Sequence, residues 1–269
     1  MLKDVTLGRY YPGSSLLHRT DPRIKIILTI SLMITVLFTK SYVAFGILAL
    51  FIFFGIKHAG IPMSFTLRGL KPVVYIIIFT ALINVFLTPG RTAFEYGFIK
   101  ITFEGLDRAF KLALRILLLM AGTSLLTLTT TPIALTDGIE KLLKPLKIVG
   151  VPVNDFALII SISLKFVPVL LDETNKIIKA QASRGVDFET KNPVKKLKNY
   201  IPVMVPLFIN TIKRADELSL AMEARCYRGG EGRTGLRKLK LTARDILVLL
   251  FVLAFEGMLL YVQFFKILV

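Results

Sequence analysis

Residues 243–265 read ARDILVLLFVLAFEGMLLYVQFF, and Glu256 is the single charged residue between Ile246 and Tyr261. A helix needs about 20 predominantly apolar residues to cross the hydrocarbon core of a bilayer. This stretch therefore predicts a transmembrane helix. Four earlier stretches have the same character, at residues 24–39, 43–57, 72–88 and 106–130. Together they predict an all-α, polytopic membrane protein with about five transmembrane helices.

Composition supports an integral membrane protein. Of the 269 residues, 54% are hydrophobic, yet the net charge is +17, so the apolar residues are gathered in blocks. A single cysteine, Cys226, excludes an intramolecular disulfide, and two histidines are too few for a Cys/His metal cluster. About twenty mostly polar residues precede the first apolar stretch, so we expect no cleaved signal peptide.

The distribution of Lys and Arg predicts the orientation of the chain. Basic residues gather before the first apolar stretch and between the second and third, whereas Lys40 is alone in the turn after the first. Basic loops favour the cytoplasm, so we expect a cytoplasmic N-terminus. More than half of the 35 basic residues fall between Thr131 and Arg244, which places that region in the cytoplasm as well.

We divide the chain into residues 1–130 with four transmembrane helices, a cytoplasmic region at 131–242, and a last transmembrane helix at 243–269. The middle region contains apolar runs such as residues 156–162 and 201–212, which are typical of amphipathic helices lying against the membrane. Seven prolines punctuate it and predict several short to medium helices. They are Pro132, Pro145, Pro152, Pro168, Pro193, Pro202 and Pro206.

Two similar arginine motifs lie in this middle region. The first is Ala180-Gln-Ala-Ser-Arg184-Gly185 and the second is Ala221-Met-Glu-Ala-Arg225-Cys226. Each arginine follows an amphipathic stretch, so we expect both to lie at helix C-termini. A cation at a helix C-terminus interacts favourably with the negative end of the helix dipole, and at an exposed position this interaction contributes about 0.3 to 1 kcal/mol. Helix stabilisation of this kind would explain each arginine without any binding function.

The repetition of the motif favours a function. Small residues near each arginine, among them Ala182 and Ser183 in one copy and Ala224 in the other, would let two helices cross closely. The planar guanidinium would then be free to contact acidic groups on another protein. The second copy has Cys226 where the first has Gly185, so the sequence predicts that the tight turn comes instead at Gly229 and Gly230.

Besides the paired arginine motifs at residues 183–185, SRG, and 224–226, ARC, two further motifs are distinctive. They are residues 11–23, YPGSSLLHRTDPR, and residues 130–132, TTP, with residues 144–147, KPLK. In these motifs the chain resembles the transmembrane coupling subunit, or T component, of energy-coupling factor transporters, which are prokaryotic importers of vitamins and metals. The resemblance covers nearly the full length.

This resemblance implies a non-catalytic scaffold in the prokaryotic cell membrane. Two crossing coupling helices would contact two ABC-type ATPases, one at each arginine, and a separate substrate-binding S component would dock on the membrane face. The ATPase-contacting residues would be Ser183, Arg184, Gly185, Ala224, Arg225 and Cys226. The S-component or helix-packing surface would include Ile177, Ala180, Leu218, Ala221 and Met222.

The chain has no Gly-rich phosphate loop, so ATP and Mg²⁺ would be bound by the partner ATPases and no cofactor by this chain. The two motifs differ, which favours two different ATPases. Basic charge also indicates contact with anionic lipid, whereas charges spread among apolar residues do not favour nucleic acid. The transported substrate is not encoded in any of these features.

Alternative classes rest on few residues. The acidic pairs Asp172-Glu173 and Asp216-Glu217 lie among lysines, which favours solvated ion pairs over a membrane enzyme. A secondary transporter or channel would use a charge inside the membrane, and Glu256 is its candidate. Arg108, Lys111 and Arg115 share one face of the fourth predicted transmembrane helix, where structural and functional roles stay equally open.

Overall fold

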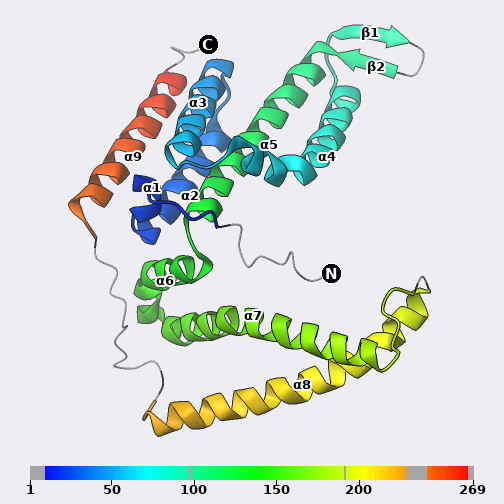
Figure 1. The fold of residues 1–269 in the computed structure, drawn as a ribbon. Coiled ribbons are helices and arrows are strands. Elements are labelled where there is room, and N and C mark those ends of the chain that lie inside the picture. Colours follow the sequence, from blue (N-terminus) through cyan, green and yellow to red (C-terminus); the bar gives the residue numbers. More distant parts are fainter. Residues whose placement is uncertain (1–9, 97–98, 191, 228, 230–240, 266–269) are drawn as a thin grey trace. The chain divides into compact units, whose positions relative to one another are not determined.

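The computed structural model describes residues 10–96, 99–190, 192–227, 229 and 241–265. They form two units, one from described residues up to 139 together with 241–265, and one from described residues between 140 and 229. The helices of the first unit are α1 (Leu16–Arg19), α2 (Pro22–Phe38), α3 (Tyr42–His58), α4 (Met63–Leu87), α5 (Phe103–Thr129) and α9 (Ala243–Phe264). Helix α6 (Pro132–Leu143) leads into the second unit, which contains the 3-10 helix η1 (Lys144–Val149), α7 (Val153–Ser183) and α8 (Pro193–Ala224) (Figure 1).

The predicted helical membrane fold is confirmed. The five predicted transmembrane stretches correspond to α2, α3, α4, α5 and α9. Among the described helices, α5 and α9 are long and apolar enough to cross a membrane, and the apolar parts of α3 and α4 are shorter. Helix α7 is also long and apolar enough to cross a membrane, although the sequence predicted only amphipathic helices in its region.

The core of the first unit lies where α2, α3, α5 and α9 meet. Val36, Ala44 and Leu48 are fully buried there, and the core continues through Leu118 of α5 and Leu259 of α9. Large apolar side chains also cover the outside of these helices, which is expected when the surrounding solvent is lipid. Helix α9 carries exposed apolar residues along its length, including Leu247, Phe251 and Met258.

Short sequence signals account for the start of α2 and for the loop after α4. Asp21 is the N-cap of α2, its side chain accepts a hydrogen bond from the Arg23 amide at 2.9 Å, and Pro22 is the first helical residue. A hairpin follows Pro89 in the loop after α4. Strands β1 (Thr92–Tyr96) and β2 (Ile99–Thr102) pair antiparallel there (Figure 1).

Two of the three basic residues in α5 have structural roles. The Arg115 Nη2 atom donates to the Thr39 carbonyl at 2.7 Å, at the C-terminal end of α2, where free carbonyls need donors. Lys111 forms an ion pair with Asp107 at 2.9 Å and lies 4.9 Å above the Tyr42 ring. Arg108 is exposed. Lys111 and Arg115 thus each have a structural contact on this face.

Prolines end fewer helices than predicted. Pro168 lies inside α7, Pro202 and Pro206 lie inside α8, and Pro72 lies inside α4, which begins at Met63 rather than at the predicted residue 72. A proline removes one backbone donor and bends a helix, but the helix continues where the turns on both sides keep their hydrogen bonds. Among the described residues of 131–242, the short α6 and η1 are therefore followed by two long helices, α7 and α8, rather than by further short ones.

Candidate functional site

Helices α7 and α8 run antiparallel and cross (Figure 1), and polar side chains join them. The Glu173 carboxylate of α7 accepts hydrogen bonds from Asn210 Nδ2 at 2.7 Å and from Arg214 Nη2 at 2.5 Å, both on α8. Further along, Gln181 Nε2 donates to the Pro202 carbonyl at 3.5 Å. Glu173 is therefore more than a solvated surface charge, because it joins the two helices.

Arg184 is the C-cap of α7, as predicted from the sequence. The Gly185 amide donates to the Ala182 carbonyl at 2.9 Å, and the Val186 amide donates to the Gln181 carbonyl at 3.1 Å. This pair of bonds is the Schellman motif, which requires a left-handed residue directly after the cap. Gly185 supplies it with φ of +89°.

Arg225 is the C-cap of α8, and the same motif closes this helix. The Cys226 amide donates to the Glu223 carbonyl at 2.8 Å, and the Tyr227 amide donates to the Met222 carbonyl at 3.0 Å. Cys226 itself is left-handed, with φ of 58°. The prediction that the turn moves to Gly229 and Gly230 is wrong for this bend, because the hydrogen bonds of the helix end impose it on Cys226. Gly229 makes a separate left-handed turn with φ of +89°, and Gly230 lies outside the described residues.

The two arginine ends are alike in geometry and lie on opposite sides of the crossing. At 1.5 Å per helical residue, Arg184 lies about 16 Å beyond Glu173, and Arg225 lies about 22 Å beyond Asn210 in the other direction. Both arginines are exposed. Within the part of the chain that the structure describes, neither guanidinium has a hydrogen bond or an ion pair.

The predicted small-residue surfaces are not where the helices cross. Ala180, Ala182 and Ser183 are exposed on α7, and Ala221 and Ala224 are exposed on α8. Hydrogen bonds between polar side chains join the two helices instead, from Asn210 and Arg214 of α8 to Glu173 of α7. Ile177 is half-buried. Leu218 and Met222 are also half-buried, and with Tyr227 they line a hollow on α8.

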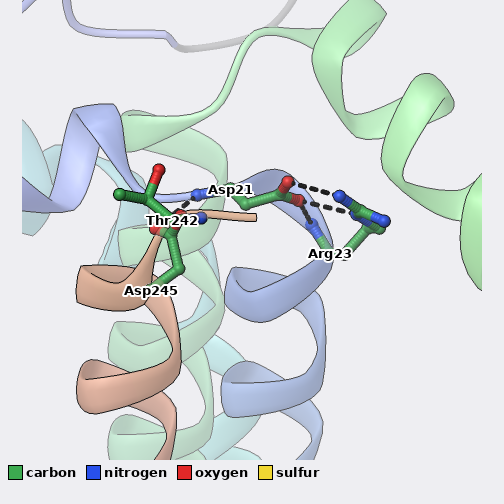
Figure 2. Close-up of polar contacts among 4 residues, drawn as sticks. All are labelled: Asp21, Arg23, Thr242 and Asp245. Carbon is green, nitrogen blue, oxygen red and sulfur yellow. Dashed lines mark hydrogen bonds and ion pairs between the residues drawn. The ribbon is translucent and has the colours of Figure 1, made fainter. Parts of the chain in front are cut away.

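A second polar centre joins the N-terminal motif to the start of α9 (Figure 2). Asp245 Oδ1 accepts from the Asp21 amide at 3.1 Å, and its Oδ2 accepts from the Thr242 amide at 3.0 Å, which completes a capping box. Asp21 forms an ion pair with Arg23 at 2.8 Å. Burial alone would raise the pKa of Asp21, but the hydrogen bonds and charge of Arg23 outweigh it and hold that pKa below its usual range.

Lys25 ties the same motif to the end of α5. Its Nζ atom donates to the His18 carbonyl at 3.2 Å, the Thr129 carbonyl at 2.9 Å and Thr130 Oγ1 at 3.3 Å. His18 Nε2 in turn bonds the Tyr11 carbonyl at 2.9 Å. The N-terminal motif and the Thr130 motif thus meet, and their role in this structure is to hold α1, α2, α5 and α9 together.

Sequence reasoning missed Asp245, Lys25 and the Glu173 contact. A capping box could have been read from Thr242 and Asp245, three residues apart before an apolar run. Nothing in the sequence paired Lys25 with residues 129 and 130, or Glu173 with Arg214, because these partners are distant along the chain.

Comparison with known proteins identifies the family. The model of the CbiQ family, described as cobalt transport protein, matches residues 13–236. The energy-coupling factor transporter transmembrane protein EcfT of Ruminiclostridium cellulolyticum is 51% identical over 248 residues, which cover 92% of this chain and 93% of the relative. Proteins of the same name from Acidaminococcus fermentans and Bacillus subtilis are 47% and 45% identical, and each match covers 98% of this chain and 98% and 100% of the relative. The chain therefore belongs to the EcfT family, the transmembrane components of energy-coupling factor transporters of the prokaryotic membrane.

Proposed function

We propose that this chain is the scaffold that joins two ABC-type ATPases to a substrate-binding S component. The observation that carries the proposal is the repeated helix end. Helices α7 and α8 both close with a Schellman motif, both place an exposed arginine at the C-cap, and the two ends project in opposite directions from one crossing. A pair of matching ends suits a pair of related partners, and an arginine fork suits acidic groups on them.

The contact at Glu173 gives this scaffold a physical means of transmission. Two helices joined at their crossing by Asn210 and Arg214 move together as a rigid pair when their ends are displaced. ATP and Mg²⁺ would be bound by the ATPases, whose closure would move Arg184 and Arg225. Because the two ends differ at Gly185 and Cys226, the proposal includes two different ATPases.

The surface for the S component would lie along the exposed apolar faces of α7 and α8. Leu218 and Met222, which line one hollow with Tyr227, belong to it, and Ile177 lies on the facing helix. The proposal puts the N-terminus and this region on the cytoplasmic side, as the rule for basic loops favours. Lys195, Lys196 and Lys198 are exposed on α8 and would suit contact with anionic lipid there.

The single cysteine allows a direct test. A bifunctional cross-linker attached to the exposed Cys226 thiol should capture one ATPase in native membranes. In a Cys226→Ser background, a Gly185→Cys variant should capture the other, since this chain already tolerates cysteine at the equivalent left-handed position. A matched Lys179→Cys variant places the thiol on an exposed face of α7, five residues before the cap, and should capture less. Absence of any ATPase from the products at both ends would contradict the proposal.

A further inference from the structure

An apolar cleft penetrates the first unit between α2, α3, α5 and α9. Its volume is about 450 Å³. Phe54 of α3 and Phe251 of α9 line it and are 61% and 69% exposed, so the cleft opens sideways between these two helices, toward the surrounding lipid. One turn away, Phe51 and Phe255 stack with ring centroids 4.8 Å apart and close the gap between α3 and α9.

Glu256 lines this cleft and has an unused acceptor. The residue is only 3% exposed, and its Oε1 atom has no hydrogen-bond partner. Buried polar atoms in native proteins are almost always hydrogen-bonded, because an unpaired one costs about 1 to 3 kcal/mol. An unpaired carboxyl oxygen at the wall of a cavity therefore points to a ligand that supplies the missing donor.

The neighbouring side chains define the charge of that ligand. The Ser31 hydroxyl donates its single proton to the Leu28 carbonyl at 3.0 Å, so Ser31 cannot supply the donor that Glu256 lacks. An ionised carboxylate buried among apolar side chains inside a membrane is very costly, so the Glu256 carboxyl is neutral. Oε1 is then the acceptor oxygen of a neutral acid. The other charged residue of the lining, Lys25, donates to three protein acceptors and has no proton left for a ligand.

The depth of Glu256 in the membrane excludes a lipid headgroup as the donor to its Oε1 atom. Glu256 lies about 16 Å along α9 from Asp245, at 1.5 Å per residue, whereas the hydrocarbon core is about 30 Å thick. The carboxyl is therefore near the middle of the core, and headgroups lie at its surface. The donor must belong to a molecule dissolved in the membrane interior.

We propose that this cleft binds a neutral lipophilic alcohol, whose hydrocarbon part fills the space between α3 and α9 and whose hydroxyl donates to Glu256 Oε1. The site is separate from the arginine ends and does not depend on the function proposed for them. It assigns a role to the one acidic residue in the apolar part of α9.

The test uses dicyclohexylcarbodiimide, an apolar reagent that modifies protonated carboxyls. The carboxyl O–H adds across one C=N bond, its proton passes to that nitrogen, and the adduct rearranges to a stable N-acylurea without loss of atoms. The full chain, purified in a detergent without hydroxyl groups, is treated with the reagent, and the modified peptide is quantified by mass spectrometry. Glu256→Gln removes the reactive group, and Gly257→Ala is the matched control, because a Cβ at Gly257 meets nothing within 4 Å.

We expect modification at Glu256 in the wild type and in Gly257→Ala. 1-Dodecanol should protect Glu256, and dodecane, which has the same chain without the hydroxyl, should need a roughly five- to tenfold higher concentration for equal protection, the worth of one hydrogen bond. Equal potency of the two compounds, or no protection by dodecanol, would overturn the alcohol site. An unreactive Glu256 would overturn the neutral, lipid-accessible carboxyl on which it rests.

Discussion

Replacing Cys226 with glycine should stabilise the end of α8, although it removes a side chain. Cys226 has φ of 58°, a conformation that costs a residue with a Cβ about 1 to 2 kcal/mol relative to the right-handed region. Glycine does not have that cost. However, it has more conformational freedom in the unfolded chain than cysteine, and this freedom reduces the gain in stability by about 0.4 to 1 kcal/mol. The net gain is about 1 kcal/mol, a factor of roughly five in the equilibrium between the closed and frayed helix end. Gly185→Ala, with φ of +89° at α7, should shift the matching equilibrium by a similar factor in the opposite direction.

Hydrogen–deuterium exchange measures this equilibrium at individual amides. In Cys226→Gly, the Tyr227 amide, which bonds the Met222 carbonyl at 3.0 Å, should exchange about fivefold more slowly than in the wild type. In Gly185→Ala, the Val186 amide should exchange about fivefold faster, and amides of α3 serve as the internal control in both variants. Unchanged or faster exchange at Tyr227 in Cys226→Gly would refute the reasoning, since it would mean that residue 226 bears no left-handed strain.

Three further substitutions probe the contacts that hold the helices together. Lys25→Met should lower the free energy of unfolding by about 2 kcal/mol in denaturant titration, because buried carbonyls lose their donor, whereas Lys57→Met at the exposed end of α3 should leave it unchanged. Asp245→Ala removes the capping box of α9 and should cost about 1 kcal/mol or more in the same measurement; a loss below about 0.3 kcal/mol would count against the junction in Figure 2. A double-mutant cycle of Glu173→Ala with Arg214→Ala should give a favourable coupling energy, small because the Arg214 side chain is 40% exposed, and additive effects would show that the ion pair does not join α7 and α8.

The type and most boundaries of the membrane helices could be predicted from the sequence, because a long apolar run can form few structures other than a transmembrane helix. The first stretch was predicted from residue 24, two residues after the observed start of α2 at Pro22, where Asp21 is the N-cap. Pro72 misled the prediction of α4. Its effect depends on whether the flanking turns hold, and those turns are stabilised by packing that no short window contains.

The sequence predicted where the two arginine helix ends lie, but not how the helices contact each other or which residue makes the left-handed turn. Periodicity located Arg184 and Arg225 at helix C-termini, and the structure has both as C-caps. The crossing was predicted from small residues, whereas it uses Glu173 and Asn210, because the register of two helices is set by contacts between residues far apart in the chain. The left-handed Cys226 was also missed, since residue preference favoured a nearby glycine and the hydrogen bonds of the helix end overrode that preference.

The most direct test of the scaffold is affinity co-purification of the tagged chain from its native membrane. Wild type is compared with Arg184→Glu, Arg225→Glu and the double variant, and Lys179→Glu, a charge reversal on an exposed face of α7, is the matched control. The account predicts that ABC-type ATPases and a small membrane protein accompany the wild type and Lys179→Glu, that each arginine reversal weakens ATPase recovery, and that the double variant abolishes it. Full recovery of the ATPases with the double variant would contradict the claim that the two arginine ends hold them.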